Sequence, residues 1–90
     1  MRLISQNGEI DVPYEMSAIR NEDNAIILNM VGETGKGSVI ARYSTSEKAQ
    51  KAMEMLHITY KGNKVEEVYQ EGTNYYHPTF QFPADEDVKV

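Results

Sequence analysis

The sequence predicts an α+β domain in which an antiparallel sheet of five to six strands packs against one main helix. Short apolar stretches joined by turn sequences fill the first half of the 90-residue chain, as in an antiparallel meander. From residue 45 onward, apolar residues recur at helical spacing instead. A chain of this length fits a single domain, 1–90. We expect the sheet to be twisted or partly closed, and a small open barrel with the helix plugging one end is the alternative.

The first two strands are expected to form a hairpin around Asn7-Gly8. This pair favours a two-residue type I′ turn, because both of its central positions need a positive φ. The resulting register places Leu3 opposite Val12, so that apolar side chains gather on one face of the hairpin. Pro13 has no N–H to donate and therefore ends the second strand or places it at a sheet edge.

A second hairpin is predicted from residues 16–20 and 25–31, which are joined by the polar loop NEDN at 21–24. Its second strand is apolar on both faces, which is typical of a central strand that is covered on both sides. A glycine-rich loop, residues 32–37, then leads to a further strand at 38–43, which completes the meander.

The main helix is predicted to begin at a capping box, Ser44-Thr45-Ser46-Glu47. In this motif the Ser44 hydroxyl accepts a hydrogen bond from the N–H of Glu47, and Glu47 reaches back to the N–H of Ser44. The apolar stripe that follows comprises Ala49, Ala52, Met53, Leu56 and Tyr60. The helix is expected to run from Thr45 to about Tyr60, with Gly62-Asn63 as its stop. For the segment beyond that stop there are two alternatives, a second short helix or a continuation of the first helix that is broken near Gly62.

Near the end of the chain, Phe80 and Phe82 alternate with polar residues, which predicts a short strand that joins the sheet. The acidic segment 84–90 is expected to be a flexible tail or, through Val88 and Val90, to extend an edge strand. Six of the fourteen acidic residues fall in the last twenty-five positions. Solubility is the simplest reason for this charge, and an acidic mimic or a tail that docks on a partner is the alternative.

The stretch VGETGKGSV at 31–39 resembles a phosphate-binding loop in its glycines, lysine and serine. A P-loop requires a glycine five residues before the Gly-Lys pair, a hydroxyl directly after the lysine, and a following helix. Aligning the motif on Gly35-Lys36 places Met30 at the first glycine and Gly37 at the hydroxyl, and the next residues, SVIARY, alternate like a strand. The glycine-rich loop is therefore predicted to connect two strands, with glycines that supply positive φ, and to bind no cofactor.

The other residues that could carry chemistry show no functional spacing. His57 and His77 match no metal-binding motif, and helix capping explains the hydroxyls at 44–46. The chain has no cysteine, which excludes thiol nucleophiles, disulfides and thiolate metal sites. We therefore predict no catalytic, cofactor-binding or metal-binding residue, and we expect that the protein is not an enzyme.

The charge of the chain bears on its partners. Fourteen acidic and nine basic residues give a formal net charge of −5, which disfavours nucleic-acid binding because that function usually needs a basic face. No apolar run approaches the ~20 residues that span a bilayer, and the opening MRLISQNGEI lacks the apolar region of a signal peptide. We expect a cytoplasmic protein that does not bind a membrane.

Four apolar or aromatic residues are candidates for an interaction surface. Met55 and Ile58 lie off the buried stripe of the helix by about 120° and 180°, and Tyr75 and Tyr76 are adjacent aromatics in a predicted loop. Such groups on a small protein favour contact with a partner protein or a homodimer. The alternative is that the C-terminal segment folds back over the helix and buries them.

Three segments of the chain also carry a resemblance. The opening MRLISQNGEIDVPYE, the helix start YSTSEKAQKAMEML and the ending FQFPADEDVKV resemble small uncharacterised proteins of phages and prophages of low-GC Gram-positive bacteria. The resemblance is weakest in the middle hairpin and between Tyr60 and His77. It implies a phage or prophage accessory protein in the host cytoplasm, and it carries no catalytic residue with it.

Taken together, the sequence favours a non-enzymatic protein-interaction module that binds a host or phage protein. The alternative is a small β-rich nucleic-acid-binding module, as such sheets can bind single strands. That alternative needs Arg2, Arg20, Lys36 and Arg42 to gather on one face despite the acidic average.

Overall fold

The computed structural model describes the backbone of residues 1–69 and 79–90 and the side chains of residues 1–61 and 79–90. The described part contains six strands, one α-helix and two short 3-10 helices. In chain order they are β1 (Arg2–Ile4), β2 (Asp11–Pro13), η1 (Tyr14–Met16), β3 (Ser17–Glu22), β4 (Ala25–Met30), β5 (Ser38–Arg42), α1 (Ser46–Tyr69), β6 (Thr79–Gln81) and η2 (Asp85–Asp87).

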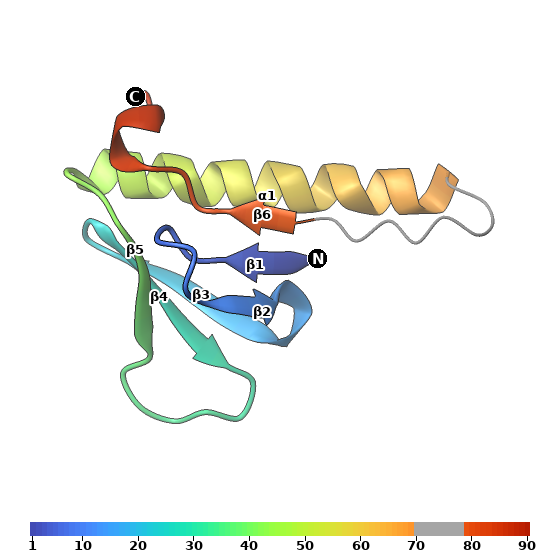
Figure 1. The fold of residues 1–90 in the computed structure, drawn as a ribbon, viewed down its shortest axis with the longest axis horizontal. Helices are drawn as coiled ribbons and strands as arrows, with labels where there is room; N and C mark the ends of the chain where they lie inside the picture. Colours follow the sequence, from blue (N-terminus) through green and yellow to red (C-terminus); the bar gives the residue numbers. More distant parts are fainter. Residues whose placement is uncertain (70–78) are drawn as a thin grey trace.

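The six strands form two three-stranded sheets, ordered β2-β1-β6 and β3-β4-β5. In Figure 1, α1 extends along the top of the molecule and the two sheets lie below it. The α+β class is therefore confirmed, whereas the single sheet of five to six strands is not found, and the described residues form no closed barrel. The sheets stay separate because Gln6, and not a further strand, meets the edge of β5. The Gln6 N–H donates to Ile40 O, and Gln6 Oε1 accepts from the N–H of Arg42.

The first hairpin has the predicted register and a different turn. Leu3 lies opposite Val12, as the segregation of apolar side chains indicates. Only Gly8 has a positive φ, 80°, and Asn7 does not, so the type I′ prediction is wrong. Asn7 stabilises the turn with its side chain instead, because its Oδ1 accepts from Ser5 Oγ and from the N–H of Glu9.

The second hairpin is tighter than predicted. β3 and β4 pair in antiparallel fashion from Ser17–Met30 to Glu22–Ala25, so the link is two residues rather than the loop 21–24. Asp23 allows this turn by adopting a φ of 52°. β4 is the central strand of its sheet and is buried on both faces, as its continuous apolar sequence predicts. The glycine-rich loop connects β4 to β5, which confirms its interpretation as a link between strands.

The helix begins one residue later than the capping box predicts and ends later as well. Thr45 caps it, since its Oγ1 accepts from the N–H of Lys48 at 3.2 Å. α1 then continues through Gly62 to Tyr69, so the stop at Gly62-Asn63, the second short helix and the break near Gly62 are wrong. A glycine inside a helix costs about 1 kcal/mol relative to alanine, which is too little to end a helix by itself.

One hydrophobic core joins the helix to both sheets. Within the predicted stripe of α1, Ala49, Ala52 and Leu56 are fully buried. The buried core comprises Leu3, Ile26, Leu28, Ile40, Ala41, Tyr43, Ala49, Ala52, Leu56, Phe80, Phe82 and Val88. Phe80 reaches this core because β6 pairs in parallel with β1, with Phe80 opposite Leu3. The predicted FQF strand therefore joins a sheet, and it joins the one built from the first hairpin.

The segment after β6 lies against the start of α1 (Figure 1). Val88 is 1% exposed and belongs to the core. Asp85 accepts a hydrogen bond from the N–H of Ser44 at 2.7 Å and one from Lys48 Nζ at 3.3 Å. Residues 84–90, which the structure describes throughout, contain η2 and no strand, so Val88 and Val90 do not extend a sheet edge.

Two donors, one in the turn of the first hairpin and one directly after β5, converge on the carbonyl of Pro83. Tyr43 Oη lies 2.8 Å from this oxygen and Gln6 Nε2 lies 3.1 Å from it. Burial, and to a smaller extent the charge of Asp85, raises the pKa of Tyr43 to about 12. The hydroxyl therefore stays protonated and donates at neutral pH, which holds the β6–η2 link against β5 and the first hairpin.

The contacts of Asp85 predict that the stability of the protein decreases at acid pH. The N–H of Ser44 and, less strongly, Lys48 lower the pKa of the Asp85 carboxyl below its ordinary value. A lowered pKa in the folded state means that this stabilisation is present above the unfolded pKa of about 3.9 and is lost as the pH falls through the folded value. We expect Asp85→Asn to lower the urea midpoint at neutral pH, and the gap to the wild type to be smaller at an acid pH below the ordinary carboxyl pKa of about 3.9.

The matched control for this experiment is Glu86→Gln, because Glu86 is exposed and belongs to the same short helix. It should leave the urea midpoint near that of the wild type at both pH values. A gap between Asp85→Asn and the wild type that has the same size at both pH values would contradict the assignment to the Asp85 carboxylate.

Candidate functional site

The interaction surface predicted from the sequence is only partly visible in the structure. Ile58 is 70% exposed on α1, as predicted. Met55 is partly buried and packs against the hydrophobic core, so it is not a free surface residue. Tyr75 and Tyr76 lie outside the described residues. In the described part of the chain, the predicted surface therefore reduces to Ile58.

A different surface is open to solvent, namely the face of the β3–β4–β5 sheet that is turned away from the core. Along β3, alternate side chains are exposed, and they lie opposite alternate residues of β4, because successive side chains of a strand point to opposite faces. β5 adds two exposed side chains to the same rows. We call this surface the outer face. Its exposed side chains are those of Ala18, Arg20, Glu22, Val39 and Arg42. Between them lie the buried β4 residues Ala25, Ile27 and Asn29.

The glycine-rich loop is tied to the outer face by Arg20 and Asn29. Arg20 donates to Asn29 Oδ1 and to Lys36 O, both at 2.7 Å, and it also lies 3.4 Å from a Glu22 carboxylate oxygen. Asn29 Nδ2 donates to Gly35 O at 3.4 Å. The Arg20 guanidinium is therefore already bonded to groups of the protein itself, and these contacts hold the end of the loop beside β5.

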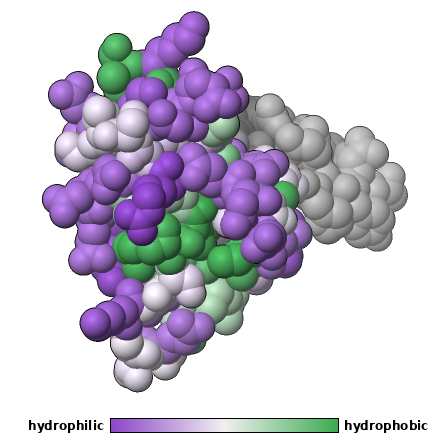
Figure 2. All heavy atoms as spheres, turned by 60° about the vertical axis from the view of Figure 1, so that its left-hand side comes forward, coloured by the Kyte–Doolittle hydropathy of each residue, from purple (hydrophilic) through white to green (hydrophobic). Residues whose placement is uncertain are grey.

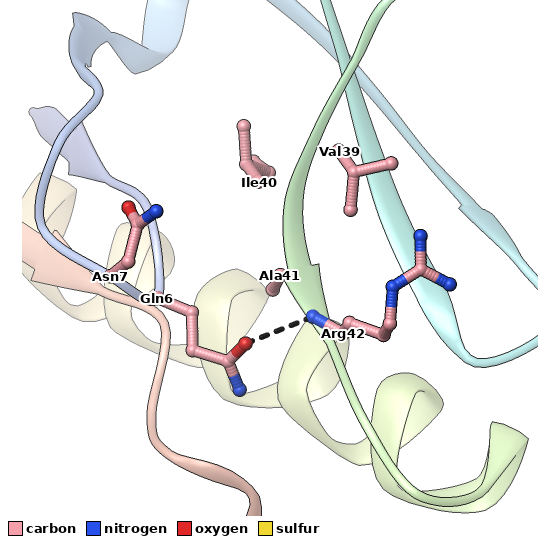
Figure 3. Close-up of a pocket in the computed structure, with 6 residues that line it drawn as sticks. All are labelled: Gln6, Asn7, Val39, Ile40, Ala41 and Arg42. Carbon is pink, nitrogen blue, oxygen red and sulfur yellow. Dashed lines mark hydrogen bonds between the residues drawn. The ribbon is translucent and has the colours of Figure 1, made fainter.

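A groove of about 190 Å³ lies where the first hairpin meets β5. Figure 3 shows its lining residues, which are Gln6, Asn7, Val39, Ile40, Ala41 and Arg42. The Gln6 side chain reaches across to the N–H of Arg42 at 3.0 Å. This volume is below the ~300–1,000 Å³ of typical small-molecule sites, so the groove suits an amino-acid side chain better than a cofactor.

Val39 and Arg42 stand beside the groove on the outer face. Val39 is 46% exposed, and the Arg42 side chain extends to the same side of β5 (Figure 3). Among the described residues, the Arg42 guanidinium forms no ion pair, whereas Arg2 pairs with Asp11 at 2.8 Å. Figure 2, with the side that carries β5 turned forward, shows an apolar area surrounded by hydrophilic residues. An apolar contact beside an open guanidinium is a common element of protein interfaces.

The sequence does not reveal this site. Val39, Ile40 and Ala41 form a continuous apolar run, and nothing in the run tells which side chain is exposed. An irregularity in the β4–β5 register, where Ile26 lies opposite Ala41 and Ile27 opposite Val39, turns Ile40 and Ala41 into buried positions. Such a bulge depends on the pairing of two strands, and alternation along one strand does not predict it.

The four basic residues required by the nucleic-acid alternative do not form one patch. Arg20 and Arg42 share the outer face, while Arg2 lies in the other sheet and pairs with Asp11. Arg20 is bound to Glu22, Asn29 and the loop.

The two histidines considered as ligands are also not brought together. His57 is exposed on α1, and His77 lies outside the described residues. Within the parts of the chain that the structure describes, no group of three or more histidine, aspartate or glutamate side chains is close enough to hold a metal ion. Nor is any described helix long and apolar enough to cross a bilayer.

No protein-family model, curated protein or solved structure matches the chain. The case for a function therefore depends on the outer face and the groove.

Proposed function

We propose that the protein is a non-enzymatic protein-interaction module that contacts its partner with the outer face and the groove beside β5. The observation that supports this proposal best is that Val39 and Arg42 share one face of β5, opposite Ile27 and Ala25. Val39 is half-exposed, and the Arg42 guanidinium forms no ion pair among the described residues. Apolar contact excludes water around such a charge, which strengthens its interaction with a partner. The size of the groove supports a side-chain ligand over a small-molecule substrate.

The partner is proposed to be a host or phage protein in the cytoplasm. The resemblance of both ends of the chain and of the helix start to phage and prophage proteins supports this setting. A second copy of the chain is the alternative occupant, and exposed Ile58 on α1 is the feature that favours it.

The proposal is tested by affinity capture from a lysate of a phage-infected low-GC Gram-positive host. The baits are the wild type, Val39→Asp on the outer face, and Ile58→Asp as a control at a more exposed position on α1. We expect the wild type and the control to retain the same protein, and Val39→Asp to lose it by about tenfold or more.

Both substitutions are at exposed positions, so thermal melting is expected to show that each variant is folded. A wild-type bait that retains no specific protein refutes the proposal. If only Ile58→Asp loses the captured protein, the interface lies on α1 instead of the outer face. A mass measurement by light scattering then shows whether the occupant is a second copy of the chain.

Nucleic-acid binding is the second candidate, because Arg20 and Arg42 share an open sheet face. Two features weigh against it. Glu22 stands on the same face, and none of the residues of the outer face is aromatic, although base stacking on aromatic rings provides much of the affinity of single-strand binders. Fluorescence anisotropy at low salt tests this candidate, and we expect no binding of single-stranded or duplex oligonucleotides at tens of micromolar protein.

A further inference from the structure

We infer that the groove beside β5 recognises an extended acidic segment of the partner protein, with Arg42 pairing a carboxylate and Val39 contacting an apolar residue. This inference rests on the proposed function and adds the chemistry of the partner. It follows from the shape of the groove, from the distribution of charge around it, and from the way the glycine-rich loop is held.

The shape of the groove favours an extended chain. Its wall on the β5 side consists of four consecutive residues, from Val39 to Arg42, so the groove follows the strand. A strand rises about 3.3 Å per residue, so a partner segment of about five extended residues matches the length of β5, with one of its side chains in the groove of about 190 Å³. Gln6 already occupies the edge of β5 at Ile40 O and at the N–H of Arg42, which leaves recognition to the side chains along the groove.

The charge beside the groove favours an acidic segment. In this acidic protein several cations are matched by nearby carboxylates: Arg2 by Asp11, Arg20 by Glu22, Lys48 by Asp85 and Lys51 by Glu54, at 2.8 to 3.5 Å. In the described part of the chain, Arg42 and Lys36 form no such pair. Lys36 comes two residues before β5 and Arg42 is the last residue of β5. An extended segment with a carboxylate near each end and an apolar centre complements Lys36, Val39 and Arg42.

The fold holds the backbone of Lys36 in place. Its carbonyl accepts from Arg20 Nη2 at 2.7 Å, and the next residue, Gly37, approaches the backbone of β4 closely. A loop that is already held in place loses less conformational entropy on binding. Glu22, the carboxylate on the outer face, pairs with Arg20 at 3.4 Å and lies on the far strand of the sheet from Arg42.

The inference is tested with three fluorescein-labelled peptides that share a valine–threonine centre and differ in their flanking residues, which are glutamate, glutamine or lysine. Fluorescence anisotropy at low salt measures binding to the wild type, Arg42→Glu, Arg42→Gln and Lys51→Glu. Lys51→Glu is the matched control, because it makes the same change of charge on α1. The folded state of each variant is checked by circular dichroism.

We expect the wild type and Lys51→Glu to bind the glutamate peptide about tenfold more tightly than the glutamine peptide, since a charged hydrogen bond contributes about that much affinity. Arg42→Gln should lose this preference, and Arg42→Glu should reverse it in favour of the lysine peptide. Added salt should weaken binding of the glutamate peptide to the wild type.

Equal binding of the glutamate and glutamine peptides, no binding of either, or an unchanged preference in Arg42→Glu overturns the inference. If Val39→Asp still loses the captured partner in that case, the proposed function stands and only the chemistry of the partner is wrong. A single-stranded oligonucleotide that binds through Arg42 while the glutamate peptide does not overturns both in favour of nucleic acid.

Discussion

Gly37→Ala is expected to destabilise the protein by about 3 kcal/mol, since it combines backbone strain with a steric clash. Gly37 has a φ of 80°, a backbone conformation that residues with a side chain rarely adopt. A Cβ at this position would lie 2.6 Å from both Asn29 Oδ1 and Leu28 O. Leu28 O belongs to the central strand β4 and has little room to move. The substitution therefore acts on the β4–β5 pairing and on the loop that Asn29 holds.

Gly35→Ala is the matched control for this prediction. Gly35 lies in the same loop with a φ of 118°, and no atom lies within 4 Å of the position of its Cβ. It should therefore show only the backbone strain, about 1 kcal/mol. Urea unfolding followed by circular dichroism gives both free energies of unfolding, and equal values for the two variants would show that the close approach to β4 is not significant.

Phe82→Ala is expected to reduce the free energy of unfolding by about 3–5 kcal/mol. The Phe82 side chain is 1% exposed, and its ring packs edge-on against Phe80 with 5.3 Å between ring centroids. Domains of this size are stable by only about 5–15 kcal/mol, so the loss removes a large part of the total. The reason is the cavity that remains at the point where the C-terminal segment enters the core.

Ile58→Ala is the control for Phe82→Ala, because it also truncates a large apolar side chain, at a position that is 70% exposed. We expect its effect to stay within about 0.5 kcal/mol. If Phe82→Ala unfolds the protein completely, Phe82→Leu gives a smaller, measurable loss. A Phe82→Ala variant as stable as the Ile58→Ala control would show that the segment after β6 does not contribute to the core.

Local sequence signals predicted much of the fold. The register of the first hairpin, the central position of β4 and the buried stripe of α1 all follow from the spacing of neighbouring apolar residues. The conformation of the turn at Asn7-Gly8 and the end of the helix near Gly62 were predicted wrongly. In the turn, the side chain of Asn7 accepts from Ser5 Oγ and from the N–H of Glu9. In the helix, a glycine costs only about 1 kcal/mol, and α1 runs through Gly62 to Tyr69.

The candidate site was less predictable than the fold. Ile58 is exposed, as its place on the helix indicates, but Met55 packs against the core. The juxtaposition of Val39 and Arg42 with Gln6 requires the first hairpin to lie beside β5. No spacing within the sequence encodes that arrangement.

The sequence by itself determined the order of most elements and the role of the glycine-rich loop as a link between strands, because turn residues, capping residues and apolar periodicity act between residues close in the chain. Only the tertiary structure decided how these elements meet. It placed Phe80 opposite Leu3, Gln6 at the edge of β5, and Asp85 at the N–H of Ser44. Such contacts join residues far apart in the chain, and local periodicity carries no information about which distant partner completes a sheet edge or caps a helix.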